Sequence, residues 1–195
     1  MSDNMTDEVV VGLSKKKVFL LIVGSFAFVA LGVWMFSLDA SSIARNLPRK
    51  DPRFVHGVGV AAIAFFGLCG SIGLRKMFDK KPGLVLNSSG ITDNSSGVSA
   101  GFIPWSEIKG AKILQVGAQK ILIIMVEKPE AYVGRGNILQ RAANKMNFNL
   151  YGTPILIASN TLKIGFPELH SLFHQYLQAF GNAGSISSTL VDSEH

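Results

Sequence analysis

The chain has 195 residues, of which 48% are apolar, a net charge of +6 and one cysteine. A mean hydropathy of +0.32 is high for a soluble protein, so membrane segments are expected. A single cysteine excludes an intramolecular disulfide. Because Cys69 lies inside an apolar run, it is predicted to be a small buried hydrophobe.

The positive charge is unevenly distributed along the chain. Residues 1–82 hold 11 Lys/Arg against 6 Asp/Glu, a balance of +5, and residues 83–195 hold 8 against 7, a balance of +1. Nucleic-acid-binding domains normally show a basic face, so the distal part is predicted to bind no nucleic acid. The sequence contains no H-E-x-x-H, C-x-x-C, G-x-S-x-G or phosphate-loop motif, and it predicts no enzyme, cofactor or metal site.

Two uncharged apolar runs follow a first segment, 1–17. Residues 18–38 form a run of 21 residues, and after a loop, 39–56, residues 57–74 form a run of 18. A helix rises 1.5 Å per residue, so runs of this length can cross a hydrocarbon core of ~30 Å. The sequence therefore predicts two transmembrane helices. Cleavage of the first as a signal peptide is disfavoured, because the run is long and a second span follows.

The second run carries small residues at helical spacing. Gly67, Gly70 and Ser71 are predicted to let two helices approach closely in lipid. The predicted partner is the first helix of the same chain, in a tight hairpin. Self-association of two copies through the same residues is the alternative, which would give an oligomer.

The orientation of the two spans follows from the Lys and Arg residues that flank them. Seven basic residues lie on the terminal sides of the spans: Lys15, Lys16, Lys17, Arg75, Lys76, Lys80 and Lys81. Four lie in the connecting loop: Arg45, Arg49, Lys50 and Arg53. Cytoplasmic flanks carry the excess of Lys and Arg. The chain is therefore predicted to be a multi-pass protein of a bacterial inner membrane with both termini in the cytoplasm.

The distal part changes to short strand-like runs separated by turn residues. These runs include "LVLN", "EIKGAKILQV", "QKILIIMVE", "PILIA" and "TLKIGF". In "GFIPWSEIKG", Pro104 cannot donate to a strand ladder and is predicted to open a strand that contains Trp105. About seven short strands are expected.

The last element is predicted to be an amphipathic helix. "FPELHSLFHQYLQAFG" places one apolar stripe at helical spacing: Leu169, Leu172, Phe173, Tyr176, Leu177 and Phe180. The fold class is therefore predicted to be a membrane-anchored α+β protein, in which a β-roll, residues 83–181, is closed by this helix. Residues 130–151 are interpreted as a helical insertion, and the polar tail 182–195 is predicted to be flexible.

The pieces "GLVLNSSGIT", "IPWSEI" and "YGTPILI", followed by the closing helix, resemble a group of uncharacterised bacterial inner-membrane proteins. These have two N-terminal helices and a pleckstrin-homology-like (PH-like) domain, and the resemblance covers residues 15 to about 180. It implies a PH-like roll with a C-terminal helix, a fold that elsewhere binds lipid headgroups or protein segments. The insertion 130–151 departs from ordinary pleckstrin-type domains. No clustered Lys/Arg loop of the phosphoinositide kind is present, so no binding residues are carried over.

Several side chains are candidates for binding. The seven basic residues that flank the spans, together with Arg135, Arg141 and Lys145 of the insertion, are candidate contacts for anionic lipid headgroups, and a solvated face is the alternative for the insertion. Trp105 is interpreted as a packing residue, with a partner platform as the alternative. His170 and His174 have a spacing that can hold a metal, but no third ligand is near in sequence, so a solvated helix face is predicted.

Together these features predict a non-enzymatic inner-membrane protein that presents a PH-like interaction module at the cytoplasmic face. Its predicted partners are the lipid bilayer and an unidentified protein, with self-association through the membrane helices as a further option. The alternative function is a membrane immunity or inhibitor protein that neutralises a toxin.

Overall fold

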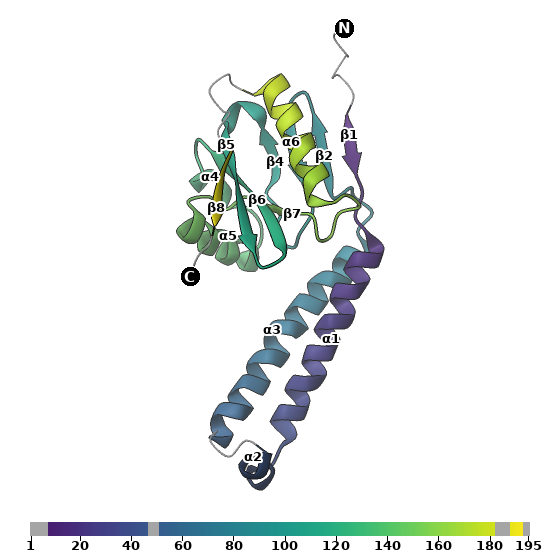
Figure 1. The fold of residues 1–195 in the computed structure, drawn as a ribbon, viewed down its shortest axis with the longest axis vertical. Coiled ribbons are helices and arrows are strands. Elements are labelled where there is room, and N and C mark those ends of the chain that lie inside the picture. Colours follow the sequence, from purple (N-terminus) through teal and green to yellow (C-terminus); the bar gives the residue numbers. More distant parts are fainter. Residues whose placement is uncertain (1–7, 47–50, 182–187, 193–195) are drawn as a thin grey trace. The chain divides into compact units, whose positions relative to one another are not determined.

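The computed structural model describes residues 8–46, 51–181 and 188–192, and these form two compact units (Figure 1). The first unit, here called the helical hairpin, is Lys15–Asp79. The second, here called the β-domain, combines the residues before the hairpin with those from Lys80 onward. The protein is therefore an α+β protein with two long apolar helices near its N-terminus.

The helical hairpin consists of two long helices joined by a short one. α1 spans Lys15–Ser37, α2 spans Ala40–Asn46 and α3 spans Pro52–Phe78, and α1 packs along α3. Asp51 caps α3 by accepting a hydrogen bond from the Arg53 N–H at 2.8 Å, and Pro52 occupies the first turn. α3 extends beyond its predicted span, 57–74, at both ends. α1 begins three residues before its predicted span, 18–38, and ends one residue before the predicted end.

Glycines allow the close approach of α1 and α3. The closest approach is made by Gly32 and Gly59, which were not predicted, and Gly70 is the predicted residue that takes part. A Cβ added to Gly32 would lie 2.8 Å from the Gly59 carbonyl oxygen, and one added to Gly59 would lie 2.8 Å from the Gly32 carbonyl oxygen. Gly70 also faces α1, 3.4 Å from the Ser25 Cβ by the same construction. Only glycine permits such backbone contact, so the tight hairpin is confirmed.

Two of the three predicted packing residues do not face α1, and a contact of these two with a second copy stays a prediction. A Cβ on Gly67 would meet nothing within 4 Å. Ser71 is exposed and its hydroxyl donates to the Gly67 carbonyl oxygen of its own helix at 2.8 Å. Their i, i+4 spacing puts both residues on one side of α3, and this side does not face α1.

The β-domain contains two four-stranded sheets. The first has the order β1-β2-β3-β4 and is antiparallel throughout, and the second has the order β7-β6-β5-β8, in which β8 is parallel to β5 and the other pairs are antiparallel. The strands are β1 Val9–Val11, β2 Leu84–Asn87, β3 Gly90–Asp93, β4 Gly101–Pro104, β5 Ile108–Val116, β6 Gln119–Val126, β7 Leu156–Ala158 and β8 Ser188–Asp192.

β1 lies in the segment that was predicted only as an N-terminal cytoplasmic stretch, 1–17. It pairs with β2, with Val11 opposite Leu84, and Leu13 forms a further bridge to Leu162. Val11 and Leu13 are buried in the core of the domain. The predicted domain boundary at residue 83 therefore omits one strand, because a three-valine run before a long apolar helix gives no local sign of its distant partner.

The segment "IPWSEI" differs from its prediction as well. Pro104 ends β4 instead of opening a strand, and Trp105 begins a short 3-10 helix, η1, at Trp105–Glu107. β5 then starts at Ile108. β4 is an edge strand of the first sheet, where a proline that lacks an N–H is tolerated. "TLKIGF" is also not a strand: it contributes only the bridge of Leu162.

The C-terminal helix closes the core as predicted. α6 spans Phe166–Phe180 and contacts β2, β6 and η1. Leu169, Phe173, Tyr176 and Leu177 are buried in the same cluster as the strand residues of both sheets. Burying a large apolar side chain stabilises a fold by roughly 1.5–3 kcal/mol, so this stripe contributes an appreciable part of the domain's stability.

The tail 182–195 was predicted to be flexible, and the structure places a strand within it. β8 pairs in parallel with β5, with Ser188 opposite Ala111 and Asp192 opposite Gln115. The sequence "STLVD" contains two β-branched residues, which favour a strand, and the outer edge of β5 offers the hydrogen-bonding groups it needs. The rest of the predicted tail, 182–187 and 193–195, lies outside the described residues.

Candidate functional site

The insertion between β6 and β7 carries the most unusual surface of the β-domain. It contains a short helix, α4, at Glu130–Val133 and a longer one, α5, at Ile138–Tyr151. Large apolar side chains of α5 point outward: Ile138 is 87% exposed, Met146 58% and Leu150 64%. With 3.6 residues per turn, they share an arc of about 120° with Leu139 and Ala142. We call these five residues the α5 surface.

The side of α5 that faces the domain carries amide side chains beside half-buried Ala143 and Phe148. Asn144 is only 5% exposed, and its side-chain amide donates to the carbonyl oxygens of Tyr132 at 3.3 Å and Arg135 at 3.4 Å. The Gln140 amide donates to the Gly97 carbonyl oxygen at 2.9 Å. A helix packed on a globular core normally buries its apolar side. α5 instead exposes its large apolar side chains Ile138, Met146 and Leu150. The hydrogen bonds of Gln140 and Asn144 hold the opposite side of the helix toward the domain.

The first turn of α5 is also fixed by a capping box. The Asn137 side chain accepts a hydrogen bond from the Gln140 N–H, and the Gln140 side chain accepts one from the Asn137 N–H, both at 2.9 Å. Gly136 precedes it with φ 85°, a value in the left-handed region that favours glycine. At the other end, Gly152 ends the helix with φ 75°.

Arg135 secures the insertion to the first sheet. Its guanidinium donates to the carbonyl oxygens of Ala100 at 3.2 Å and Phe102 at 3.0 Å, and it lies 3.8 Å above the centroid of the Tyr132 ring. The Tyr132 hydroxyl donates to a carboxylate oxygen of Glu107 at 2.7 Å. Arg135 therefore has a structural role in the fold, although its predicted role was to contact lipid headgroups.

Burial raises the pKa of the Tyr132 hydroxyl to about 12, and its hydrogen bond to Glu107 acts in the same direction. The phenol therefore stays neutral near pH 7 and remains a donor. This keeps the contact between α4 and η1 intact across the ordinary range of pH.

The other predicted headgroup residues of the insertion lie beside the α5 surface. Arg141 is exposed and its Nε donates to the Gly136 carbonyl oxygen at 2.9 Å, and Lys145 is exposed. At 100° per residue both lie on the border of the apolar arc next to Ile138. The sequence has no Asp or Glu between Glu130 and Glu168. We call Arg141 and Lys145 the basic edge of the α5 surface.

The predicted headgroup residues of the hairpin gather at one of its ends, since α1 begins where α3 finishes. The Lys15 ammonium donates to the carbonyl oxygens of Lys76 at 3.2 Å, Met77 at 2.6 Å and Asp79 at 2.8 Å, so it caps α3. The Lys76 ammonium pairs with the Asp79 carboxylate at 3.4 Å. The remaining members differ in burial: Lys16, Arg75, Lys80 and Lys81 are exposed, and Lys17 is half-buried.

Trp105 is a packing residue and its ring offers no platform to a partner. The side chain is 1% exposed, and its ring lies 5.8 Å from that of Phe173 and 6.0 Å from that of Tyr176, measured between centroids. Its Nε1 donates to the Asn87 carbonyl oxygen at 2.7 Å. The packing interpretation is confirmed, because the aromatic side chains of α6 cover the indole.

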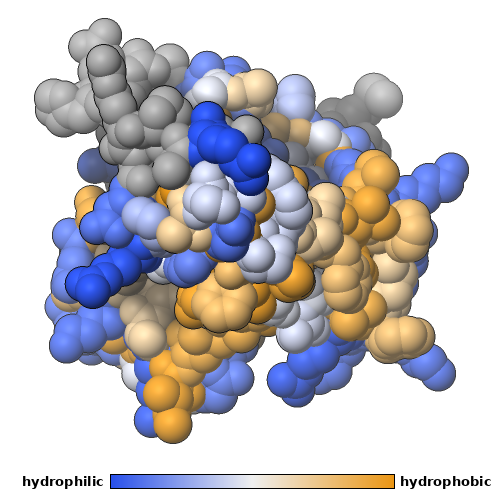
Figure 2. Space-filling model, turned by 90° about the horizontal axis from the view of Figure 1, so that it is seen from below, coloured by the Kyte–Doolittle hydropathy of each residue, from blue (hydrophilic) through white to orange (hydrophobic). Residues whose placement is uncertain are grey.

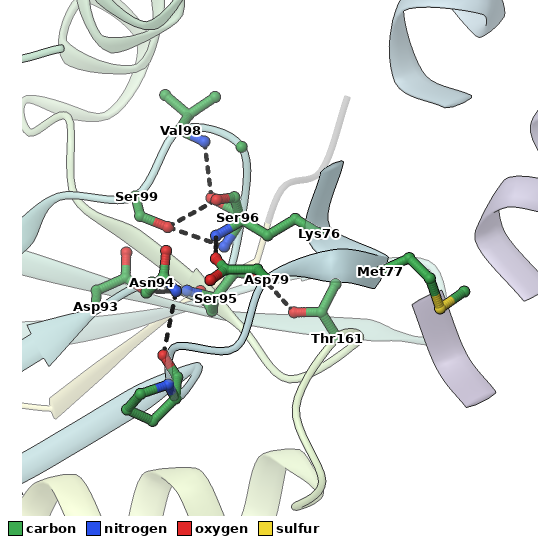
Figure 3. A network of polar contacts seen from close by, with 12 residues as sticks. Lys76, Met77, Asp79, Asp93, Asn94, Ser95, Ser96, Val98, Ser99 and Thr161 are labelled. Atoms are coloured by element: carbon green, nitrogen blue, oxygen red, sulfur yellow. Dashed lines mark hydrogen bonds and ion pairs between the residues drawn. The ribbon is translucent and has the colours of Figure 1, made fainter. Parts of the chain in front are cut away.

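The loop after β3 holds a cluster of short polar side chains (Figure 3). Asp93, which is 3% exposed, accepts hydrogen bonds from the Ser95 N–H and hydroxyl through one carboxylate oxygen and from the Ala100 N–H through the other. The Thr161 hydroxyl donates to the Ser95 carbonyl oxygen. These bonds close the loop on itself, so we assign the cluster a structural role.

His170 and His174 are not the solvated pair that was predicted. Both are half-buried, their ring centroids are 4.3 Å apart, and the Nε2 atom of each is buried without a hydrogen-bond partner. Burial lowers the pKa of His174, and the charge of His170 lowers it further. Within the described part of the chain, no three His, Cys, Asp or Glu side chains come together as metal ligands.

Comparison of the chain with family models, with curated proteins and with solved structures finds no match. The function therefore has to be inferred from the geometry of the hairpin and of the α5 surface. Sequence spacing predicted a helix at α5, but it did not predict which side of the helix faces outward, because that depends on the hydrogen bonds of half-buried Gln140 and buried Asn144.

Proposed function

We propose that this chain is a non-enzymatic protein of the bacterial inner membrane. In this proposal α1 and α3 cross the membrane as a hairpin, both termini lie in the cytoplasm, and the β-domain is a PH-like module for binding lipid or protein at the cytoplasmic face. One observation carries the proposal: an apolar helical hairpin is inserted between two neighbouring strands of one sheet, β1 and β2.

The outer surface of the hairpin supports a lipid environment. α1 and α3 have 23 and 27 residues, lengths that suffice to span a membrane. Phe26, Trp34 and Phe65 are 57%, 59% and 61% exposed, unlike the side chains of a core helix. The face shown in Figure 2 carries apolar patches interspersed with hydrophilic residues. Exposed apolar surface such as that of Phe26, Trp34 and Phe65 is unfavourable in water, at about 25 cal/mol per Å².

The pairing of β1 with β2 supports an even number of crossings. Val11 lies opposite Leu84, and the Gly83 N–H donates to the Val11 carbonyl oxygen at 2.8 Å. The chain therefore has to leave and re-enter the β-domain on one side of any membrane. The Lys and Arg asymmetry, seven residues against four, favours the cytoplasm as that side.

The order of elements supports a PH-like roll. A four-stranded antiparallel sheet, β1 to β4, is followed by the antiparallel strands β5, β6 and β7, and α6 then packs against members of both sheets. β1 supplies one of these seven strands, and β8, which follows α6, is an eighth.

Reporter fusions test the topology. Alkaline phosphatase, which is active only outside the cytoplasm, is expected to be inactive when it is fused after His195 and active when it is inserted in the loop between α1 and α3. A cytoplasmic reporter at the same two positions should give the opposite pattern. Phosphatase activity at His195 would contradict the proposed orientation, and release of the chain by alkaline carbonate washing would contradict membrane insertion.

Capture of the full-length chain in mild detergent tests the interaction module. We expect a lipid class or a protein to be enriched reproducibly over an unrelated two-span membrane protein carrying the same tag. The enrichment should be lost when the β-domain is unfolded by a core substitution such as Leu169→Asp, because Leu169 is fully buried. Equal recovery with the unfolded variant would contradict a role for the β-domain.

A further inference from the structure

We infer that the α5 surface lies in the anionic headgroup layer of the membrane that holds the hairpin, so that the β-domain is attached to this membrane at a second place. The inference rests on the proposed membrane insertion of the hairpin. Beyond that insertion, the α5 surface would be a second membrane contact, made by apolar side chains and by the cations of the basic edge. The experiments below test this contact separately from insertion of the hairpin.

The shape and polarity of the α5 surface fit a membrane interface. Helices that lie at such an interface present an apolar face to the acyl boundary and basic residues at its border. The apolar face of α5 consists of Ile138, Leu139, Ala142, Met146 and Leu150, and all five are exposed. Arg141 and Lys145 form its border.

The charge of the insertion favours an anionic lipid surface over a basic or neutral partner. Residues 131–151 contain Arg135, Arg141 and Lys145 and no acidic residue, a balance of +3. Cytoplasmic leaflets carry a negative surface potential, and each Lys or Arg near them gains on the order of 1 kcal/mol. Arg135 is engaged with β4, so the basic edge supplies the cations that remain available at the surface.

The α5 surface is built to face outward and does not result from a loosely attached helix. α5 is held by the capping box at Asn137, by the amides of half-buried Gln140 and buried Asn144, and by the hydrogen bonds of Arg135. Burying an amide costs free energy unless it is hydrogen-bonded, and both of these amides have partners. The amides of Gln140 and Asn144 are therefore hydrogen-bonded on the inner side of α5, while the apolar side chains of the α5 surface stay exposed.

The connection to the hairpin keeps the β-domain at the membrane. The Ser14 N–H donates to the Thr161 carbonyl oxygen at 2.7 Å within the β-domain, and α1 begins at the next residue, Lys15. No linker separates the two units at this point. Tethering converts a weak surface contact into an intramolecular one with a high effective concentration, so a surface with two available cations suffices.

Fluorescence quenching in reconstituted membranes tests the inference with the full chain. In a Cys69→Ser background, Met146→Cys is labelled with an environment-sensitive fluorophore, and the protein is placed in vesicles containing roughly 30% phosphatidylglycerol and a headgroup-region nitroxide lipid. We expect strong quenching at position 146 and at Leu150→Cys. The matched control, Gln175→Cys, lies at an exposed position of α6 and should show little quenching.

Charge variants test the role of the basic edge. Arg141→Gln and Lys145→Gln are each expected to lower the ratio of membrane-bound to free α5 about fivefold, which corresponds to ~1 kcal/mol per cation. The control Lys120→Gln removes an exposed lysine of β6 and should leave the ratio unchanged. Replacing phosphatidylglycerol by phosphatidylcholine should reduce quenching in the same way.

Two results would overturn the inference while leaving the hairpin proposal intact. The first is the absence of quenching at 146 and 150 when protease protection of the inter-helix loop shows that the hairpin is inserted. The second is efficient cross-linking of two chains through Met146→Cys, which would make a second copy the occupant. Loss of loop protection itself would refute the proposed function, so the two failures are distinguishable.

Discussion

The indole N–H of Trp105 donates to the carbonyl oxygen of Asn87, the last residue of β2, at 2.7 Å. This bond joins η1, which connects the two sheets, to the first sheet. The same ring lies against Phe173 and Tyr176 of α6. One side chain therefore contacts the first sheet, the connection to the second and the closing helix.

Trp105→Ala is expected to lower the free energy of unfolding of the β-domain by about 3–5 kcal/mol, because it removes a fully buried ring and leaves a cavity. Trp105→Phe keeps much of the ring volume and should cost less, mainly through the unpaired Asn87 carbonyl. Denaturant unfolding of the full chain in detergent measures both. Val116→Ala, at a 55% exposed position, is the control and should change stability by less than about 0.5 kcal/mol. An equal effect of Trp105→Ala and Val116→Ala would contradict the packing role.

The packing of the hairpin predicts which cysteine pair can form a disulfide. In a Cys69→Ser background, Ser25→Cys with Gly70→Cys should oxidise readily, because a Cβ at position 70 would lie 3.4 Å from that of residue 25, close to disulfide geometry. Ser25→Cys with Gly67→Cys should not, since position 67 faces away from α1. Mobility shifts on non-reducing gels after mild oxidation report the bond. A disulfide in the Ser25→Cys/Gly67→Cys variant and none in the Ser25→Cys/Gly70→Cys variant would show that another face of α3 contacts α1.

The contribution of β1 can be tested by comparing two neighbouring valines. Val11 is 5% exposed and Val10 is 55% exposed, so Val11→Asp buries a charge and Val10→Asp does not. We expect Val11→Asp to destabilise the β-domain by several kcal/mol and Val10→Asp by less than about 1 kcal/mol. Melting of the full chain, followed by circular dichroism, measures the difference.

A fragment of residues 83–181 provides a second test of β1. It is expected to be insoluble or partly folded, because the apolar partners of β1 on β2, Leu84 and Leu86, lose their cover. Two-state unfolding of this fragment with the stability of the full chain would show that β1 is dispensable.

The stability of the β-domain should decrease in mild acid because of His174. Burial and the neighbouring His170 lower its pKa in the folded state below the ordinary value of 6.5. Between these two pKa values the unfolded chain binds more protons, so this contribution is complete above about pH 6.5 and is lost as the pH falls toward the lowered pKa. His174→Gln should flatten the fall in melting temperature between about pH 7.5 and pH 5.5, and His170→Gln should reduce it partly. A profile unchanged by His174→Gln would assign the acid sensitivity to other groups.

Local sequence patterns predicted the elements whose partners lie close in the chain or follow from periodicity. The apolar runs gave the two helices of the hairpin, and the stripe from Leu169 to Phe180 gave α6 with its buried side. β1 could not be found in this way, because its strand partner is about 70 residues away and three valines also suit the start of a membrane span. The α5 surface was missed for a different reason: the apolar periodicity of a helix does not say whether its apolar side packs inward, and here buried amides decide it.

The packing glycines illustrate the same limit. Gly67 and Ser71 have the spacing of a close helix contact, yet Gly32 and Gly59 make the contact. Spacing identifies residues on one side of a helix, but the rotation of that helix about its axis depends on all the side chains along its partner. The sequence therefore predicted the hairpin and one of its contact residues, Gly70.

The insertion of the hairpin between β1 and β2 sets an order of events during synthesis. Val11 leaves the ribosome 73 positions before its partner Leu84, which at 5–20 residues per second is a delay of roughly 4–15 s. During that time both helices are made, and β1 has to stay unpaired on the side of the membrane where the proposed hairpin begins and ends. The first sheet can be completed only after the chain has returned to the side where it began. A chain in which only one of the two helices crosses the membrane would leave β1 and β2 on opposite sides, so the first sheet would be one strand short and the edge of β2 would be exposed to proteolysis.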